Sequence, residues 1–250
     1  MRAVNLTWDL DRIDLTTLTP AREEHPLTRL SRVVPDLIRE DTGLEGYAIT
    51  QARVAELLTV LSPHAEYVQH PGDDLDVLIP VALIRAYSLL TTSLGSGMFV
   101  LGREHSDALH AEAAQYQALD AGRFRGGGQV GGGGTVRTPE GFFDAHAPGE
   151  GGVKLREVYA EGLAAIGAIA HPVLRGATYA SWAAYHQFYH DGNKRTGRLM
   201  MNGVLIAGGY HPIVVRAEDA EAYHGSLTEM YATGDATPAI AYLAERYVPG

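Results

Sequence analysis

The chain has 250 residues, of which 46% are hydrophobic and 20% charged, and this composition predicts a globular protein with one substantial core. A formal net charge of −10 argues against broad binding to nucleic-acid phosphates, which needs many clustered lysines and arginines. There is no cysteine and no apolar run of about 18 residues, so we expect a cytoplasmic protein without disulfides, thiolate metal sites or a membrane span.

Residues 1–40 are predicted to form an N-terminal arm with no more than a short helix, because hydrophobic periodicity is weak among them. The next segment, DTGLEGYAIT at 41–50, predicts a turn. Thr50 is a good N-cap, and the apolar residues that follow recur at helical spacing. These are Val54, Leu57, Leu58 and Leu61. We therefore expect a turn that leads into an amphipathic helix.

Two further helices are expected before residue 120. Val81 to Leu94 is apolar enough to be a buried helix, which Gly95 ends. Residues 105–119 are rich in helix formers and carry a capping candidate at Ser106. Four histidines lack a metal-ligand spacing and are interpreted as surface or cap residues: His64, His70, His105 and His110.

Residues 121–152 have the composition of a flexible surface loop, with glycines at 126–128 and 131–134. Helical patterns then return at 153–170, 175–189, 218–231 and 238–247. Because period-two runs are almost absent, the predicted fold class is all-α.

The segment at 186–198, HQFYHDGNKRTGR, carries the strongest functional signal. Asp191-Gly192-Asn193 is a turn, and the apolar run that follows it predicts a helix beginning near Asn193. A helix N-terminus offers unpaired N–H groups and partial positive charge, and Gly192 allows a ligand oxygen to approach the backbone. The turn is therefore a predicted anion site.

Three cations reinforce this prediction. Lys194, Arg195 and Arg198 lie in the first turns of the helix, where positive charge opposes the helix dipole unless an anion is bound. Asp191 supplies a hard oxygen ligand suited to Mg²⁺. Phosphates together with a metal ion are the predicted ligands.

These residues resemble the core motif of the Fic family, H-x-F-x-[DE]-G-N-[GK]-R-x-x-R, and the match is complete from Asp191 to Arg198. The resemblance implies a Fic/fido-type helical bundle. It also implies that Asp191 holds Mg²⁺, that Gly192 and Asn193 cradle the α- and β-phosphates of a nucleotide, and that Arg195 and Arg198 grip the phosphates, with Lys194 beside them.

The family's general base does not transfer cleanly. Counted back from Asp191 without a gap, Gln187 falls at the position of the catalytic histidine and Tyr189 at that of the phenylalanine. Counted from His186 and Phe188, the motif requires one inserted residue. We prefer the ungapped register because it needs no extra structural feature. A glutamine can orient a nucleophile but cannot take its proton.

Two upstream segments extend the resemblance. Residues 41–50 are similar to the family's inhibitory motif, S-S-x-I-E-G-N-x-L-T, which implies that Glu45 pairs with Arg198 in the space of a γ-phosphate. Asp41 and Thr42 replace the motif's serines. The family also places a β-hairpin flap after a segment like Ala121 to Arg125, with Val130 and Val136 as the strand candidates here, and the many glycines predict a loose clamp. The Fic-like domain is thus expected to span 41–250.

The first functional hypothesis is an AMPylator-like nucleotidyltransferase that passes AMP from ATP, with Mg²⁺, to a protein or small-molecule acceptor, with an atypical or missing base. The alternative is a nucleotide-binding sensor or interaction module without transferase activity. A lesser alternative is a Doc-like phosphotransferase, suggested by Lys194. Nucleotide and acceptor are the expected partners, a homodimer is compatible with each hypothesis, and neither a membrane nor nucleic acid is expected.

Overall fold

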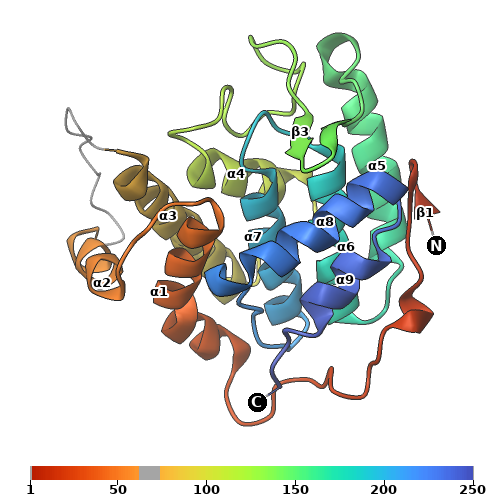
Figure 1. The fold of residues 1–250 in the computed structure, drawn as a ribbon. Helices are drawn as coiled ribbons and strands as arrows, with labels where there is room; N and C mark the ends of the chain where they lie inside the picture. Colours follow the sequence, from red (N-terminus) through yellow and green to blue (C-terminus); the bar gives the residue numbers. More distant parts are fainter. Residues whose placement is uncertain (1, 62–73, 250) are drawn as a thin grey trace.

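The computed structural model describes residues 2–61 and 74–249, and helices dominate this part of the chain (Figure 1). The all-α prediction is confirmed. The described strands belong to two short antiparallel hairpins, β1 (Arg2–Ala3) with β2 (Leu6–Thr7) and β3 (Thr135–Thr138) with β4 (Gly141–Asp144). The helices are α1 (Pro26–Leu44), α2 (Gln51–Val60), α3 (Leu75–Gly95), α4 (Arg103–Ala113), α5 (Val153–Gly167), α6 (Pro172–His186), α7 (Asn193–Ala207), α8 (Ala220–Thr233) and α9 (Thr237–Ala244), with single 3-10 turns at Leu10–Arg12, Glu150–Gly152 and Ala217–Asp219.

Helices α6 and α7 form the centre of the molecule (Figure 1). Their close approach depends on small residues, since a Cβ atom on Gly197 would lie 3.2 Å from the backbone of Ala180. A Cβ atom on Gly176 would lie 2.6 Å from the Leu205 side chain. Helix α7 is consequently buried on nearly every side, including at its polar residues. The predicted motif helix therefore lies in the core, and it begins at Asn193 as expected.

Helix α1 is the main difference from the sequence prediction. It has 19 residues and lies where a peripheral arm with a short helix was expected. Leu30 and Ile38 are fully buried, and α1 packs against α3. Pro35 inside the helix removes a backbone donor, which weakens the local helical signal although tertiary packing maintains the helix. Helix α1 also continues through residue 40 and ends at Leu44, so the predicted turn at 41–50 starts about one helical turn later.

The neighbouring helices agree with the patterns, with shifted ends. Thr50 caps α2 by accepting a hydrogen bond from the Arg53 amide at 3.2 Å. Helix α3 starts six residues earlier than expected, whereas α4 ends at Ala113 and has Gly102 rather than Ser106 at its N-cap. His64 and His70 lie outside the described residues.

Helix α3 is, within the described ranges, the one helix long and apolar enough to cross a bilayer, although 56% of its apolar window is buried in the protein. It packs against α1, α4 and α7 as a core helix does.

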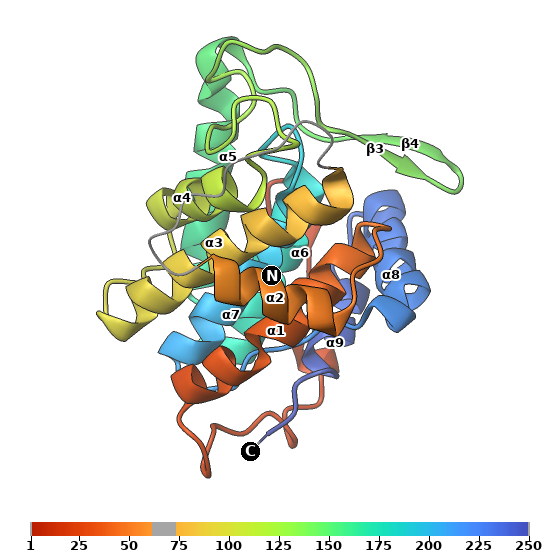
Figure 2. The same cartoon turned by 90° about the vertical axis from the view of Figure 1, so that its left-hand side faces the viewer.

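The β3–β4 hairpin extends beyond the helical body near α8 (Figure 2). It lies in the segment where a flap was expected, and Val136 pairs with Phe143 in its ladder. Val130 is not in a strand, which corrects that part of the prediction. Its amide instead donates to the Asp120 carboxylate at 2.9 Å.

Candidate nucleotide site

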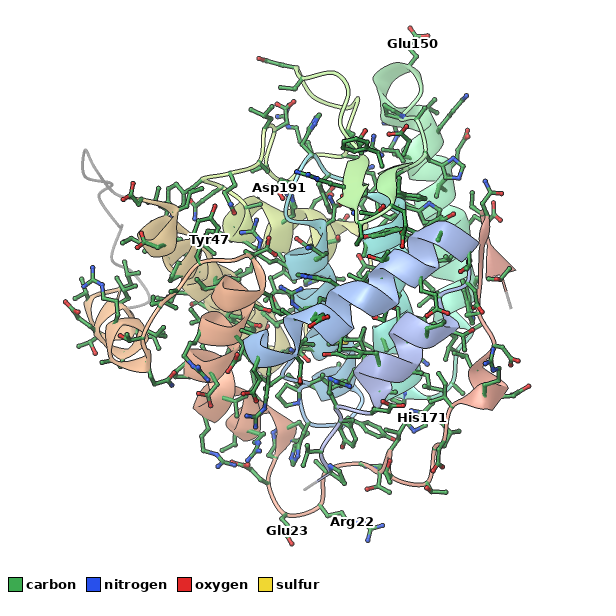
Figure 3. The ribbon with its side chains drawn as sticks, viewed as in Figure 1. Arg22, Glu23, Tyr47, Glu150, His171 and Asp191 are labelled. Carbon is green, nitrogen blue, oxygen red and sulfur yellow. The ribbon has the colours of Figure 1, made fainter. Side chains whose placement is uncertain are left out.

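The junction between α6 and α7 is a tight loop set by two left-handed residues. Gln187 ends α6 with φ +47°, and Gly192 precedes α7 with φ +72°. A Cβ atom on Gly192 would lie 2.8 Å from that of Ala114, so both the backbone angle and the space favour glycine. Asp191 lies at this end of α7 (Figure 3). The helix N-terminus is thereby directed at the loop, as the motif predicted.

Asn193 stabilises the loop from within. Its side-chain oxygen accepts from the Tyr189 amide at 2.9 Å, and its side-chain nitrogen donates to the Tyr189 carbonyl at 2.9 Å and to Gln187 Oε1 at 3.0 Å. The side chain is thus occupied in bracing the loop. Any contact of Asn193 with a phosphate would have to come from its backbone.

His110 braces the same loop from α4. Its ring stacks on Tyr189 with centroids 3.8 Å apart and planes 11° apart. The Gly122 amide donates to Nδ1 at 2.8 Å, so the proton is on Nε2, which donates to the Asp191 carbonyl at 2.8 Å. Burial lowers the pKa of His110 to about 4, and the ring is neutral at pH 7. The prediction of a surface or cap histidine was wrong.

Ser106 belongs to the same brace rather than to a helix cap. It is buried, and its hydroxyl lies 2.8 Å from the Tyr189 hydroxyl, which in turn donates to Asp107 at 2.8 Å. The spacing of Ser106 and His110 places them on one face of α4, but no local pattern distinguishes such a face from a solvated one.

The two motif arginines are buried side by side. Arg195 is 0% exposed and donates from Nη1 to the Ala113 carbonyl at 3.0 Å. Arg198 is 2% exposed and donates from Nε to Asp41 at 2.6 Å. Within the described chain, Nε and Nη2 of Arg195 and Nη2 of Arg198 are buried without a hydrogen-bond partner. An anion oxygen would satisfy such donors.

Glu45, which is the C-cap residue of α1, faces these donors. Its Oε1 lies 3.7 Å from Arg195 Nε and 3.8 Å from Arg198 Nη2, so the expected proximity to Arg198 is present and Arg195 is equally close. Burial raises the pKa of Glu45, but Arg195, Lys194 and Arg198 outweigh burial and hold it below its ordinary value. Glu45 is therefore ionised at pH 7.

The two candidate base positions lie in different surroundings. His186 is 0% exposed, stacks near the His146 ring at 5.4 Å, and has no described partner for either ring nitrogen. Burial lowers its pKa to about 3. Gln187 instead lines the pocket beside Glu45 and Asp191. Its side-chain nitrogen donates to the Ala184 carbonyl at 2.6 Å.

The base of the flap is held by Arg125, which the sequence did not single out as a site residue. Its buried guanidinium donates to the Gly133 carbonyl at 2.7 Å, to the His146 carbonyl at 2.9 Å, and to the carbonyls of His186 and Gln187 at the end of α6. Both ends of the flap segment are thus tied to the loop of the motif.

The glycines of the flap have a specific steric role at this point. A Cβ atom on Gly134 would lie 2.4 Å from the Arg125 guanidinium, and one on Gly133 would lie 2.7 Å from the His190 ring. Both glycines also have positive φ. They allow the backbone to lie directly over the arginine. The glycines, which predicted a loose clamp from composition, therefore have a steric role here.

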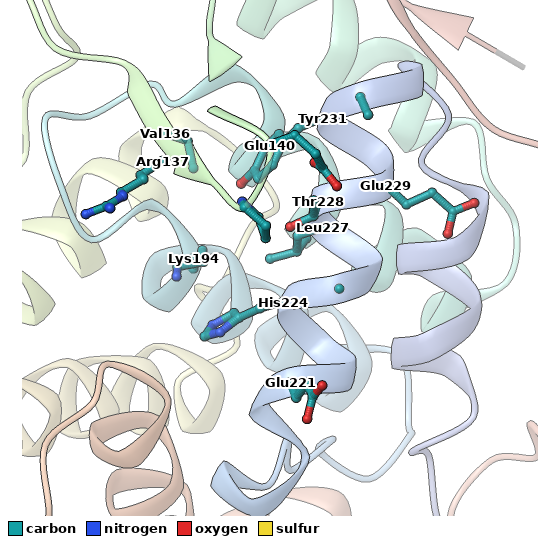
Figure 4. Close-up of a pocket in the computed structure, with 13 residues that line it drawn as sticks. Val136, Arg137, Glu140, Lys194, Glu221, His224, Leu227, Thr228, Glu229 and Tyr231 are labelled. Carbon is teal, nitrogen blue, oxygen red and sulfur yellow. The ribbon is translucent and has the colours of Figure 1, made fainter. Parts of the chain in front are cut away.

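Two neighbouring hollows, which share lining residues, lie between the flap, α8 and the motif loop. The larger, about 760 Å³, is bordered by the hairpin and by α8 (Figure 4). The smaller, about 230 Å³, reaches Glu45 and Asp191. Both are lined by Val136, Arg137, Lys194 and Tyr231. Such dimensions suit a ligand with an apolar ring at one end and anionic groups at the other.

Asp191 is the one predicted metal ligand. Its side chain is 53% exposed and lines the smaller hollow, and its Oδ1 accepts from the Gly192 amide at 2.6 Å. No group of three or more potential ligands occurs in the described residues. A single carboxylate still fits Mg²⁺, which binds proteins through one or two carboxylates and completes its shell with water and substrate phosphates.

Sequence comparison finds similar proteins over part of the chain, although no family model matches. A protein adenylyltransferase Fic from Culex quinquefasciatus is 31% identical over 117 residues, which cover 45% of this chain and 23% of the relative. One from Nematostella vectensis is 34% identical over 76 residues, covering 30% and 18%. The matched part spans about a fifth of each relative's length.

Structural comparison covers nearly the whole chain. A Fic domain containing signaling protein from Bacteroides thetaiotaomicron superposes with a TM-score of 0.68 and 20% identity, covering 92% of this chain and 88% of that one. IbpAFic2, solved in complex with adenylylated Cdc42, superposes with a TM-score of 0.51 and 14% identity, covering 93% and 66%. These structures establish the fold. The chain thus has the fold of Fic domains and resembles Fic proteins in sequence over part of its length.

Proposed function

We propose that this protein is a nucleotidyltransferase that transfers AMP from ATP, with Mg²⁺, to an acceptor. The observation that carries the proposal is the set of buried guanidinium nitrogens on Arg195 and Arg198, beside the N-terminus of α7, that find no hydrogen-bond partner in the described part of the chain. Buried charged donors are costly when unpaired, and phosphate oxygens supply the matching acceptors. The curated relatives, which are named protein adenylyltransferases, support the same reaction class.

The chain's residues would act mainly by positioning and by stabilising charge. Arg195, Arg198 and the first amides of α7 would hold the phosphates of the nucleotide. Asp191 would hold Mg²⁺, which supplies charge neutralisation when bound. The larger hollow by α8 would receive the nucleoside. The acceptor oxygen forms a bond to the α-phosphorus, and the bond from that phosphorus to the bridging oxygen breaks, so that pyrophosphate leaves with the electron pair.

Neither of the two candidate base positions offers a destination for the proton of the acceptor. Gln187 faces the pocket but cannot accept a proton, whereas His186 is buried with a pKa of about 3. This geometry favours the ungapped register. An acceptor that is already a good nucleophile, such as a carboxylate, needs no base. The adenylylated Cdc42 bound by IbpAFic2 supports a protein as acceptor, and a small molecule is the alternative.

The second candidate is a nucleotide-binding protein without transfer, which the position of Gln187 favours. Calorimetry with ATP and ADP, with and without Mg²⁺, tests the shared nucleotide site. Pyrophosphate release and mass spectrometry of acceptors separate the two functions. Transfer of 329 Da, the mass of an AMP moiety, would identify adenylylation, whereas a phosphate added to the acceptor would identify a Doc-like phosphotransferase. Binding without either product would support the sensor.

A further inference from the structure

Arg198 has a second carboxylate partner that is closer than Glu45. Asp41, on the last turn of α1, is 3% exposed, and its Oδ1 accepts from Arg198 Nε at 2.6 Å. Its Oδ2 accepts from the Tyr87 hydroxyl at 3.0 Å. Burial and Asp41 raise the pKa of Tyr87, so this hydroxyl keeps its proton and remains a donor. Asp41 thus accepts hydrogen bonds from Tyr87 of α3 and from Arg198 of α7.

The edges of the Arg198 guanidinium face different partners. Nε faces Asp41, and Nη1 lies 3.4 Å from the Tyr223 hydroxyl on α8. Nη2 faces Glu45 at 3.8 Å, beyond hydrogen-bond distance. Burial opposes the charge of Arg198, but Asp41, Tyr223 and Glu45 outweigh it and raise the pKa of the guanidinium. The orientation of Arg198 therefore does not depend on what occupies its Nη2 edge.

Among the described residues, Asp41 adds a third carboxylate to the groups that face the motif cations. Lys194, Arg195 and Arg198 face the carboxylates of Asp41, Glu45 and Asp191. Without Asp41, Glu45 would be the nearest anion to both arginines, and the net positive charge would draw it more strongly. Asp41 therefore weakens the attraction that holds Glu45 in place.

We propose that Asp41 is a positioning residue that fixes Arg198 and partly neutralises it, so that Glu45 occupies the anion site as a displaceable carboxylate. The inference rests on the proposed function, because it concerns the same phosphate site. It explains why Glu45 lies 3.7 to 3.8 Å from the two guanidinium groups rather than in direct hydrogen bonds. An incoming phosphate then has to displace a weakly held group.

The test is a double-mutant cycle on nucleotide affinity. Mg-ADP binding is measured by calorimetry for wild type, Glu45→Gly, Asp41→Asn and the double variant. We expect Glu45→Gly to raise affinity several-fold in the wild-type background. In the Asp41→Asn background, Glu45→Gly should raise affinity at least ten times more than that. Among the described residues, Glu45 is then the one carboxylate within 4.0 Å of Arg198. Asparagine keeps the shape and an acceptor for Arg198.

Tyr87→Phe is the matched control, because it removes a contact of Asp41 and leaves its charge. It should leave the effect of Glu45→Gly unchanged. If Tyr87→Phe and Asp41→Asn shift that effect equally, packing rather than charge is responsible and the inference is overturned. If Asp41→Asn does not fold, Asp41→Ser, the residue of the family motif, takes its place in the cycle.

The remaining outcomes separate the two proposals. Equal effects of Glu45→Gly in both backgrounds, with nucleotide bound by all four proteins, would overturn the role of Asp41 alone. Absence of nucleotide binding in all four would overturn the proposed function, and the role of Asp41 with it.

Discussion

The two sides of the pocket are built differently. On the phosphate side, α1, α4 and α7 contribute buried groups that hold one another, such as Asp41 with Arg198 and His110 with the Asp191 carbonyl. On the flap side, Arg125 ties down both ends of a glycine-rich segment whose hairpin extends outward, with Phe142 exposed by 75%. The first side consists of groups held by buried contacts, whereas the second extends beyond the helical body (Figure 2).

The largest expected effect is on the phosphate side. Arg195→Ala should weaken nucleotide binding by about 2 to 5 kcal/mol, the range typical of losing one member of a desolvated charge pair. Calorimetry with ATP and Mg²⁺ measures it. Arg32→Ala, a half-exposed arginine on α1, is the control and should bind like wild type. Equal affinity for Arg195→Ala and the control would remove the phosphate assignment.

The second-largest expected effect is a loss of unfolding free energy in acid. An unfolded histidine has a pKa of about 6.5, and the folded pKa values of His110 and His186 are about 4 and about 3. Below pH 6.5 the unfolded chain therefore binds protons that the folded chain does not, so stability present above pH 6.5 is lost as the pH falls toward 4. Each histidine contributes a slope of at most about 1.4 kcal/mol per pH unit.

Denaturant unfolding at pH values from 4 to 7 measures this slope. His110→Gln should reduce this slope by up to about 1.4 kcal/mol per pH unit, the contribution of one proton. An identical slope for His110→Gln and wild type would contradict the buried neutral state of His110.

On the flap side, Arg125→Met should cost about 1 to 3 kcal/mol of unfolding free energy, because carbonyls at the flap base lose their donor. The hairpin should become sensitive to proteases between 126 and 146, while nucleotide affinity changes less than in Arg195→Ala. Limited proteolysis followed by mass spectrometry locates the cuts. Arg137→Met, which changes an arginine within the hairpin rather than at its base, is the control. Cleavage unchanged from wild type would show that Arg125 does not secure the flap.

The smallest effect is expected at His186. Because Gln187 lines the pocket and His186 does not, His186→Ala should leave pyrophosphate release within a few-fold of wild type, whereas Gln187→Ala should impair it. Gln187→His could accept a proton and should strengthen transfer to hydroxyl acceptors. A loss of about 10² to 10⁴ in rate for His186→Ala, with nucleotide affinity intact, would make His186 the base instead.

The sequence by itself determined the helical class, the start of α7 at Asn193 and the cap at Thr50, because helical periodicity and capping are local properties. The motif from Asp191 to Arg198 also predicts an anion site at the start of this helix. By contrast, the patterns missed most of α1, whose proline and weak periodicity are offset by packing against α3.

Only the tertiary structure decided which polar residues serve the site. Asp41, His110 and Arg125 look like ordinary helix-surface or loop residues in sequence, and each becomes buried because elements distant in the chain close over it. Their partners lie at sequence separations of 157, 81 and 62 residues, in Arg198, Asp191 and Gln187. A buried polar group needs such hydrogen-bond partners, and sequence patterns within one segment do not identify partners that lie far away in the chain.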